Sequence, residues 1–111
     1  MFSAAFIFEP GDYDAEFHRL NDLIDAAARS NPGFIGTESW QSADGRRRNA
    51  TYYWHTLESL KEFSNHVRHL EAKKQYRNWY KGYQIVVSEV IRSYGDGRIE
   101  HLTPNTRDGR H

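Results

Sequence analysis

The amino-acid sequence predicts one α+β domain in which two helices cover one face of a four-stranded antiparallel sheet. Three observations lead to this fold class. Segments with the alternating apolar pattern of strands are interleaved with two segments that have helical spacing. Turn-forming residues separate these segments, which follow one another in the order βαββαβ. The length of 111 residues suits a single domain and is too short for two.

The chain begins with a predicted strand and a predicted helix. Residues 2–9 alternate as a strand with three phenylalanines on one face. Pro10-Gly11 breaks the strand, and Asp12 or Asp14 can cap a helix that continues to about Ser30. An apolar stripe along one side of this helix predicts that it packs on the sheet. The Asn-Pro-Gly sequence that follows ends the helix, since proline cannot continue it.

A hairpin and a second helix come next. A second strand is predicted from Phe34 to about Ser42, and Asp44-Gly45 is a hairpin signal because glycine tolerates positive φ. The third strand ends at Trp54 and should pair antiparallel with the second. Thr56 can cap the second helix. A break near Asn65 is expected, after which the helical spacing resumes in an offset segment.

The last predicted strand spans residues 83–94 and is apolar on both faces, as is typical of a central or an interface strand. Short connections and right-handed crossovers then arrange the six elements as a ferredoxin-like fold. We assign residues 1–94 to this domain and residues 95–111 to a C-terminal tail. The tail has little apolar content, so we expect it to be loose or to act as an arm on a partner.

The face of the sheet opposite the helices is expected to meet a second copy of the chain. The third strand carries large side chains on both faces, with Tyr52 and Trp54 opposite Tyr53 and His55. Two helices can cover only one of these faces. The sequence therefore predicts a homodimer that forms through the open sheet face.

Composition excludes several functional classes. Lys plus Arg and Asp plus Glu both number 15, so no overall charge attracts nucleic acid or an anionic membrane. No apolar run approaches the roughly 20 residues that span a bilayer, and the first residues lack the basic start of a signal peptide. We expect a cytoplasmic protein with neither partner. Without cysteine, thiolate catalysis and zinc-thiolate sites are excluded.

Candidate site residues gather between the second helix and the last strand. His66 and His69 stand three apart, so on a continuous helix they share a face and are able to bind a ligand or exchange protons. Solvent-facing or capping roles remain the alternative. No carboxylate completes a metal-binding set around them, so no metal is expected. His69 is the preferred candidate for handling a proton.

Several aromatic residues are candidates for lining a ligand pocket. Trp54, Tyr76, Trp79 and Tyr80 combine flat faces for stacking with polar groups that orient substituents. Between the sheet and the helices they are expected to line a pocket for a small aromatic molecule. Aromatic residues at the ends of elements also serve as core or interface, and this alternative stays open.

Several motifs together resemble the antibiotic biosynthesis monooxygenase superfamily of dimeric α+β barrels. The resemblance covers about residues 2–94 and rests on residues 32–36 (Pro-Gly-Phe-Ile-Gly), the Asp44-Gly45 turn, Tyr53-Trp54, residues 69–73 (His-Leu-Glu-Ala-Lys) and Trp79-Tyr80. It implies oxygenation of an aromatic or polyketide-like substrate without metal, flavin or other cofactor. In such an enzyme His69 would handle the proton, while Trp54, Tyr76, Trp79 and His66 would bind the substrate.

The chain departs from the superfamily's polar pocket residues at three positions. Trp54 matches, but Trp40, Ala50 and Leu60 stand where a His, an Asn and a Tyr are expected. A second hypothesis is therefore a non-catalytic dimeric module that binds a small molecule or is associated with stress. A haem-binding or haem-degrading protein is the third, although the axial His position falls near Lys73, one helical turn beyond His69.

Overall fold

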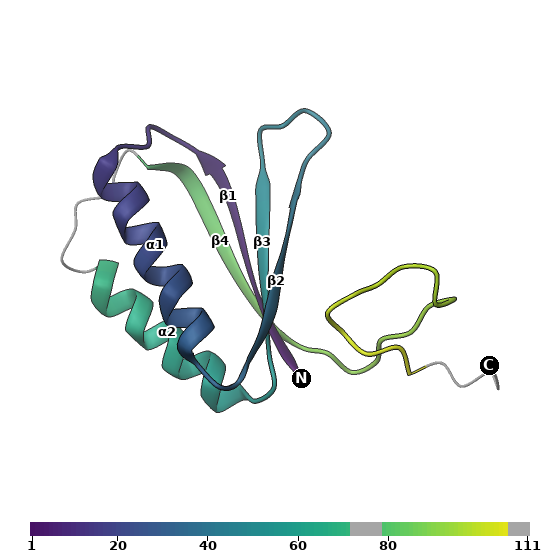
Figure 1. The fold of residues 1–111 in the computed structure, drawn as a ribbon. Helices are drawn as coiled ribbons and strands as arrows, with labels where there is room; N and C mark the ends of the chain where they lie inside the picture. Colours follow the sequence, from purple (N-terminus) through teal and green to yellow (C-terminus); the bar gives the residue numbers. More distant parts are fainter. Residues whose placement is uncertain (72–78, 107–111) are drawn as a thin grey trace.

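The computed structural model describes residues 1–71 and 79–106 and contains the six predicted elements in the predicted order. These are β1 (Phe2–Pro10), α1 (Ala15–Ser30), β2 (Phe34–Gln41), β3 (Arg48–Trp54), α2 (Leu57–Glu71) and β4 (Tyr80–Glu89). The sheet is antiparallel with the strand order β2-β3-β1-β4. Both helices lie on the same side of it (Figure 1). The α+β, ferredoxin-like fold predicted from the sequence is confirmed.

Helix α1 is capped at both ends by hydrogen bonds to its free backbone groups. The carboxylate of Asp14 accepts a hydrogen bond from the Phe17 N–H at 2.8 Å, so the cap is Asp14 and not Asp12. At the other end the Asn31 N–H donates to the Ala28 carbonyl at 3.1 Å. The chain then passes α2 so closely that only glycine fits, because a Cβ on Gly33 would lie 2.0 Å from the Ser59 hydroxyl oxygen.

Helix α2 is continuous, so the predicted break near Asn65 is wrong. Thr56 caps it as expected, accepting the Ser59 N–H at 3.1 Å. Apolar residues keep helical spacing across the predicted break, with Phe63 and Val67 both turned toward the sheet side. The Asn65 side chain binds Arg68 on the exposed face and leaves the backbone intact. Packing on one face therefore prevails over the weak helix propensity of Asn65.

Strand β4 begins and ends earlier than the predicted range 83–94. Its partner β1 begins at Phe2, which lies opposite Glu89, so no further strand is left for β4 to pair with. One more hydrogen bond joins the Val90 N–H to the Met1 carbonyl at 2.9 Å. Beyond it Ile91 is 90% exposed. Apolar content alone does not reveal this limit, because it is imposed by the length of the neighbouring strand.

Residues 90–106 form a loop on the side of the sheet opposite the helices (Figure 1). The loop is closed by Thr106, whose N–H and hydroxyl both donate to the Ser93 carbonyl at 2.9 and 2.7 Å. It then contacts β2, where Leu102 packs on Gly36. Several hydrogen bonds therefore join residues 93–106 to one another, and residues 107–111 of the predicted tail lie outside the described residues. The domain boundary at residue 94 and the role as an arm stay predictions.

The core lies between the sheet and the two helices. Ala28, Trp54 and Leu60 are buried there, with partly buried apolar side chains around them. β4 is different, since Ile85 and Val86 on its two faces are 57% and 41% exposed. Within residues 1–71 and 79–106, no helix is long and apolar enough to cross a membrane.

Candidate functional site

A cavity of about 140 Å³ lies between the sheet and the helices. Strands β1, β3 and β4 and both helices contribute to its wall: Ala4, Ala5, Phe6, Asn21, Ile24, Tyr52, Phe63, Ser64, Val67, Tyr80 and Ile85. Because Ile85 is 57% exposed, the cavity opens to solvent beside β4. It combines apolar walls with a few polar groups, which is the usual character of a ligand site.

The sequence of β1 explains why the hollow forms where it does. Alternate residues of β1 face the helices, and these are Phe2, Ala4, Phe6 and Phe8. Ala4 is the one small residue in this row. It lies opposite Tyr52 of β3 on one side and opposite Val87 of β4 on the other. The space that a fourth phenylalanine would fill is therefore left empty.

Aromatic residues close one end of the cavity. Tyr80 meets Phe6 edge-on with ring centroids 5.2 Å apart and Phe8 at 5.4 Å. Phe6 and Phe8 stack on each other at 4.9 Å, and Phe17 of α1 packs against Tyr80 at 6.0 Å. Each ring is held by at least one other ring, so this wall is rigid.

A second aromatic group closes the opposite end. Tyr52 stacks on Phe63 of α2 at 5.6 Å, and Trp54 lies behind them at 4.8 Å from Phe63. Burial raises the pKa of Tyr52, the Asp25 charge raises it further, and Arg29 partly offsets this. The Tyr52 phenol therefore stays protonated and able to donate a hydrogen bond.

The polar groups of the cavity are neutral. Asn21, Ser64, Tyr52 and Tyr80 supply amide and hydroxyl groups, and none of the described lining residues is charged. Within residues 1–71 and 79–106 the side chains of Asn21 and Tyr52 make no hydrogen bond. They are thus available to a ligand.

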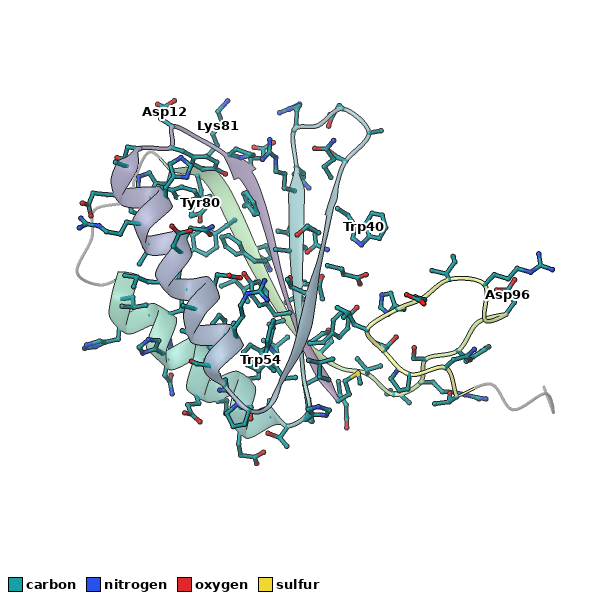
Figure 2. The ribbon with its side chains drawn as sticks, viewed as in Figure 1. Asp12, Trp40, Trp54, Tyr80, Lys81 and Asp96 are labelled. Atoms are coloured by element: carbon teal, nitrogen blue, oxygen red, sulfur yellow. The ribbon has the colours of Figure 1, made fainter. Side chains whose placement is uncertain are left out.

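The predicted pocket residues Trp54 and Trp79 are both deeply buried and do not line the cavity. Trp54 is 0% exposed and belongs to the core between sheet and helices (Figure 2). Trp79 is 3% exposed, and its indole N–H donates to Asp14 at 3.1 Å. Through this hydrogen bond Trp79 connects the start of β4 to the start of α1. Tyr80 does line the cavity, as expected.

The two predicted histidines lie on the other side of α2. His66 and His69 are both exposed in the last turns of the helix, whereas Phe63, Ser64 and Val67 face the cavity. Tyr76 lies outside the residues that the structure describes. No group of three His, Cys, Asp or Glu side chains able to hold a metal is found in residues 1–71 and 79–106.

Sequence reasoning missed most of the residues that form the cavity. Two signals were available: one alanine among phenylalanines at alternate positions of β1, and the spacing of four between Phe63 and Val67 on α2. Both patterns are equally typical of a packed core. The hollow itself depends on how far α2 stands from β1, which no local pattern reveals.

A polar cluster outside the cavity joins the C-terminal loop to the sheet. Glu38 accepts hydrogen bonds from the Tyr53 hydroxyl and from His101 Nε2, each at 2.7 Å. The Thr103 N–H donates to His101 Nδ1 at 3.1 Å, so the proton of the neutral ring is on Nε2. Burial raises the pKa of Glu38, but the hydrogen bonds of Tyr53 and His101 outweigh it and lower it overall. Burial and Glu38 raise the pKa of Tyr53 to about 12.

Comparison with known proteins identifies a family that matches most of the chain. A model of the monooxygenase af470-like family matches residues 11–88. The uncharacterised protein YqjZ of Bacillus subtilis (strain 168) is 31% identical over 80 residues, which are 71% of this chain and 69% of YqjZ.

Solved structures share the fold at low sequence identity. Rv0793 from Mycobacterium tuberculosis has a TM-score of 0.65 at 16% identity and covers 85% of this chain and 98% of its own. SnoaB from Streptomyces nogalater, a cofactor-independent oxygenase, has a TM-score of 0.58 at 15% identity over 83% of this chain and 94% of its own. Other proteins with this fold are described as antibiotic biosynthesis monooxygenases, which confirms the resemblance stated above.

Proposed function

This chain belongs to the monooxygenase af470-like family, and on that premise we propose that it oxygenates a small aromatic substrate without a cofactor. The observation that carries the proposal is the cavity between sheet and helices, whose two ends are walls of aromatic rings. Such walls orient a flat molecule by stacking on its faces and edges. Orientation is a large part of what a site without charged groups contributes to a reaction.

The reaction balances without an external reductant. An electron-rich phenol plus O₂ gives a quinone plus water: one oxygen atom enters the ring, and the other leaves with the two hydrogens that the substrate loses. The four electrons that O₂ accepts come from the substrate. The residues of this chain then bind and orient, with Tyr52 donating a hydrogen bond to the substrate oxygen and Phe6 and Phe63 enclosing its ring.

A proton-transfer role for His69 stays a prediction. The ring is exposed on α2, away from the residues that line the cavity. If His69 takes part, it acts on substrate or water at the opening. The variant His69→Ala separates this role from that of the cavity.

The second candidate function is a module that binds a small molecule without transforming it. One observation favours it: no side chain among the described cavity residues has a charge for acid-base chemistry near neutral pH. Binding without oxygen uptake would be the result expected from this function.

The cavity does not fit haem, the third hypothesis from the sequence. Its volume of about 140 Å³ is well below the several hundred Å³ of sites for large ligands. No histidine is among the described residues that line it, so none of these can serve as an axial ligand. We derive no step through haem.

Oxygen uptake tests the proposal. The full-length protein is mixed with electron-rich phenols and hydroquinones in an oxygen electrode. We expect uptake above the uncatalysed rate, and at least a tenfold loss in Tyr52→Phe, because the hydrogen bond to the substrate is removed. His69→Ala tests the histidine in the same assay. Absence of enzyme-dependent uptake with every substrate would contradict the proposal and favour the binding module.

A further inference from the structure

We infer that the cavity selects a neutral molecule with a single ring, and that Ala4 sets this limit. The inference rests on the proposed function, since it names the class of substrate that the same site would take. It goes further in excluding fused polycyclic compounds and anions. Three features of the cavity carry it: its volume, the position of Ala4 in its wall, and the absence of charged side chains among the described residues that line it.

The volume matches one ring. A dry apolar cavity of about 150 Å³ is known to accommodate benzene. The cavity here has a volume of about 140 Å³ and walls of the same chemical kind. Between the Phe6–Tyr80 pair and the Tyr52–Phe63 pair there is no room for a second fused ring, which would have to displace one of these pairs or extend into solvent through the opening beside β4. Each of these rings is packed against further aromatic residues, so neither pair moves without losing contacts.

Ala4 determines that volume. It lies on the central strand of the sheet, with its neighbours Phe2 and Phe6 on the same face. Tyr52 and Val87 flank it on the adjacent strands. A leucine at position 4 would extend into the hollow between these residues and occupy the place of the ligand ring.

The polar groups select for a neutral ligand. The wall offers the Tyr52 hydroxyl and the Asn21 amide as hydrogen-bonding groups, and no cation among the described lining residues to pair with an anion. Burying a carboxylate without a counter-charge is strongly unfavourable. A phenol is neutral at pH 7 and its oxygen can accept from Tyr52, whereas benzoate is charged.

The inference is tested by binding measured in the absence of oxygen. ¹⁹F NMR titrations of the full-length protein compare 4-fluorophenol with 4-fluorobenzoate and with 6-fluoro-2-naphthol. We expect 4-fluorophenol to bind at least tenfold more tightly than either of the others. This comparison uses the natural chain and does not depend on the folding of a variant.

Two variants then assign the size limit to the cavity. Ala4→Leu should weaken 4-fluorophenol binding at least tenfold, while Ala43→Leu, at an exposed turn position, should leave it unchanged. Phe63→Leu, which removes part of one wall, should improve naphthol binding relative to phenol.

The outcomes separate this inference from the proposed function. Equal or tighter binding of naphthol or benzoate, or no binding of 4-fluorophenol, would overturn the inference. Phenol binding without any oxygen uptake would overturn the proposed function and leave the inference standing. Turnover of a fused-ring substrate would support the proposed function and overturn the inference.

Discussion

The indole of Trp54 is completely enclosed, yet its N–H has no hydrogen-bond acceptor within residues 1–71 and 79–106. An unpaired buried donor costs about 1–3 kcal/mol. The ring itself packs on Phe34 and Phe63 at 5.1 and 4.8 Å. Trp54 therefore stabilises the fold through apolar contacts, and the cost of its unpaired N–H offsets part of that stabilisation.

Two substitutions at Trp54 should separate the effect of the apolar ring from the effect of the unpaired N–H. Trp54→Phe removes the N–H and keeps an aromatic ring, so we expect the free energy of unfolding to change by less than about 1 kcal/mol, because relief of the unpaired donor offsets the lost volume. Trp54→Ala leaves a large void and should cost about 3–5 kcal/mol. Urea denaturation followed by circular dichroism measures both. Equal losses in the two variants would show that the N–H is needed.

Glu38 makes stability depend on pH in the acid range. Its pKa is lowered below the ordinary value of 4.5, so its contribution is complete above that pH and is lost as the pH falls through the lowered pKa. We expect Glu38→Gln to reduce the free energy of unfolding by about 1–2 kcal/mol at pH 7, because two charge-assisted hydrogen bonds are weakened. The difference from the natural protein should shrink below pH 4.5.

Urea denaturation at a series of pH values measures this difference. The matched control is Glu62→Gln, at an exposed position of α2, which should show no such trend. A difference that stays constant from pH 7 to the acid range would mean that the Glu38 charge has no part in holding the loop.

The structure places both predicted histidines outside the cavity for a physical reason. A spacing of three shows only that two histidines lie on the same face of a helix. Whether that face is buried or exposed depends on where the helix packs. The continuous α2 turns Phe63 and Val67 inward and thereby directs His66 and His69 outward. Tyr80 lies in the wall of the cavity because β4 begins at this residue, three positions before the predicted start of the strand.

At the scale of elements, the sequence predicted most of the fold because helix starts and turns are local signals. Asp14, Thr56 and the Asp44-Gly45 turn act as expected, and Gly45 has the positive φ of 73° that glycine tolerates. The end of β4 could not be predicted in this way, because it depends on where a distant strand begins.

Asp14 joins two elements through a single oxygen atom. Its Oδ1 accepts both the Phe17 N–H, which starts α1, and the Trp79 indole N–H, which precedes β4. Asp14→Ala should therefore lower the midpoint of thermal unfolding, because both hydrogen bonds are lost. Asp14→Asn keeps one such oxygen and should recover most of the loss. Thermal unfolding compares the two.

The control for this prediction is Asp12→Ala. Asp12 is also exposed and precedes α1, but it makes no hydrogen bond to the helix within the described residues. Its substitution should be nearly neutral. A loss equal to that of Asp14→Ala would show that overall negative charge before α1, rather than the cap, stabilises this end of the molecule.

At the scale of the whole molecule, one face of the sheet has no layer of helices. Ala5 and Val86 lie side by side on it in β1 and β4, opposite the helices. The C-terminal loop reaches only the part near Glu38 and Tyr53. Val86 is 41% exposed on this face. A second copy of the chain that covers the face would bury these side chains, which is the arrangement we predict.

Charge introduced into the open face should prevent that association. Val86→Asp would place a carboxylate where two apolar faces meet, so we expect a dimer of the natural protein to become a monomer in light scattering at micromolar concentration. Leu23→Asp is the matched control, because Leu23 is 49% exposed on α1, on the helical side of the molecule, and should leave the dimer intact. The cavity lies on the helical side as well, so 4-fluorophenol binding should survive Val86→Asp if the site belongs to one chain alone. A natural protein that is already a monomer would contradict the predicted homodimer, and loss of binding in the Val86→Asp monomer would show that the second copy helps to form the cavity.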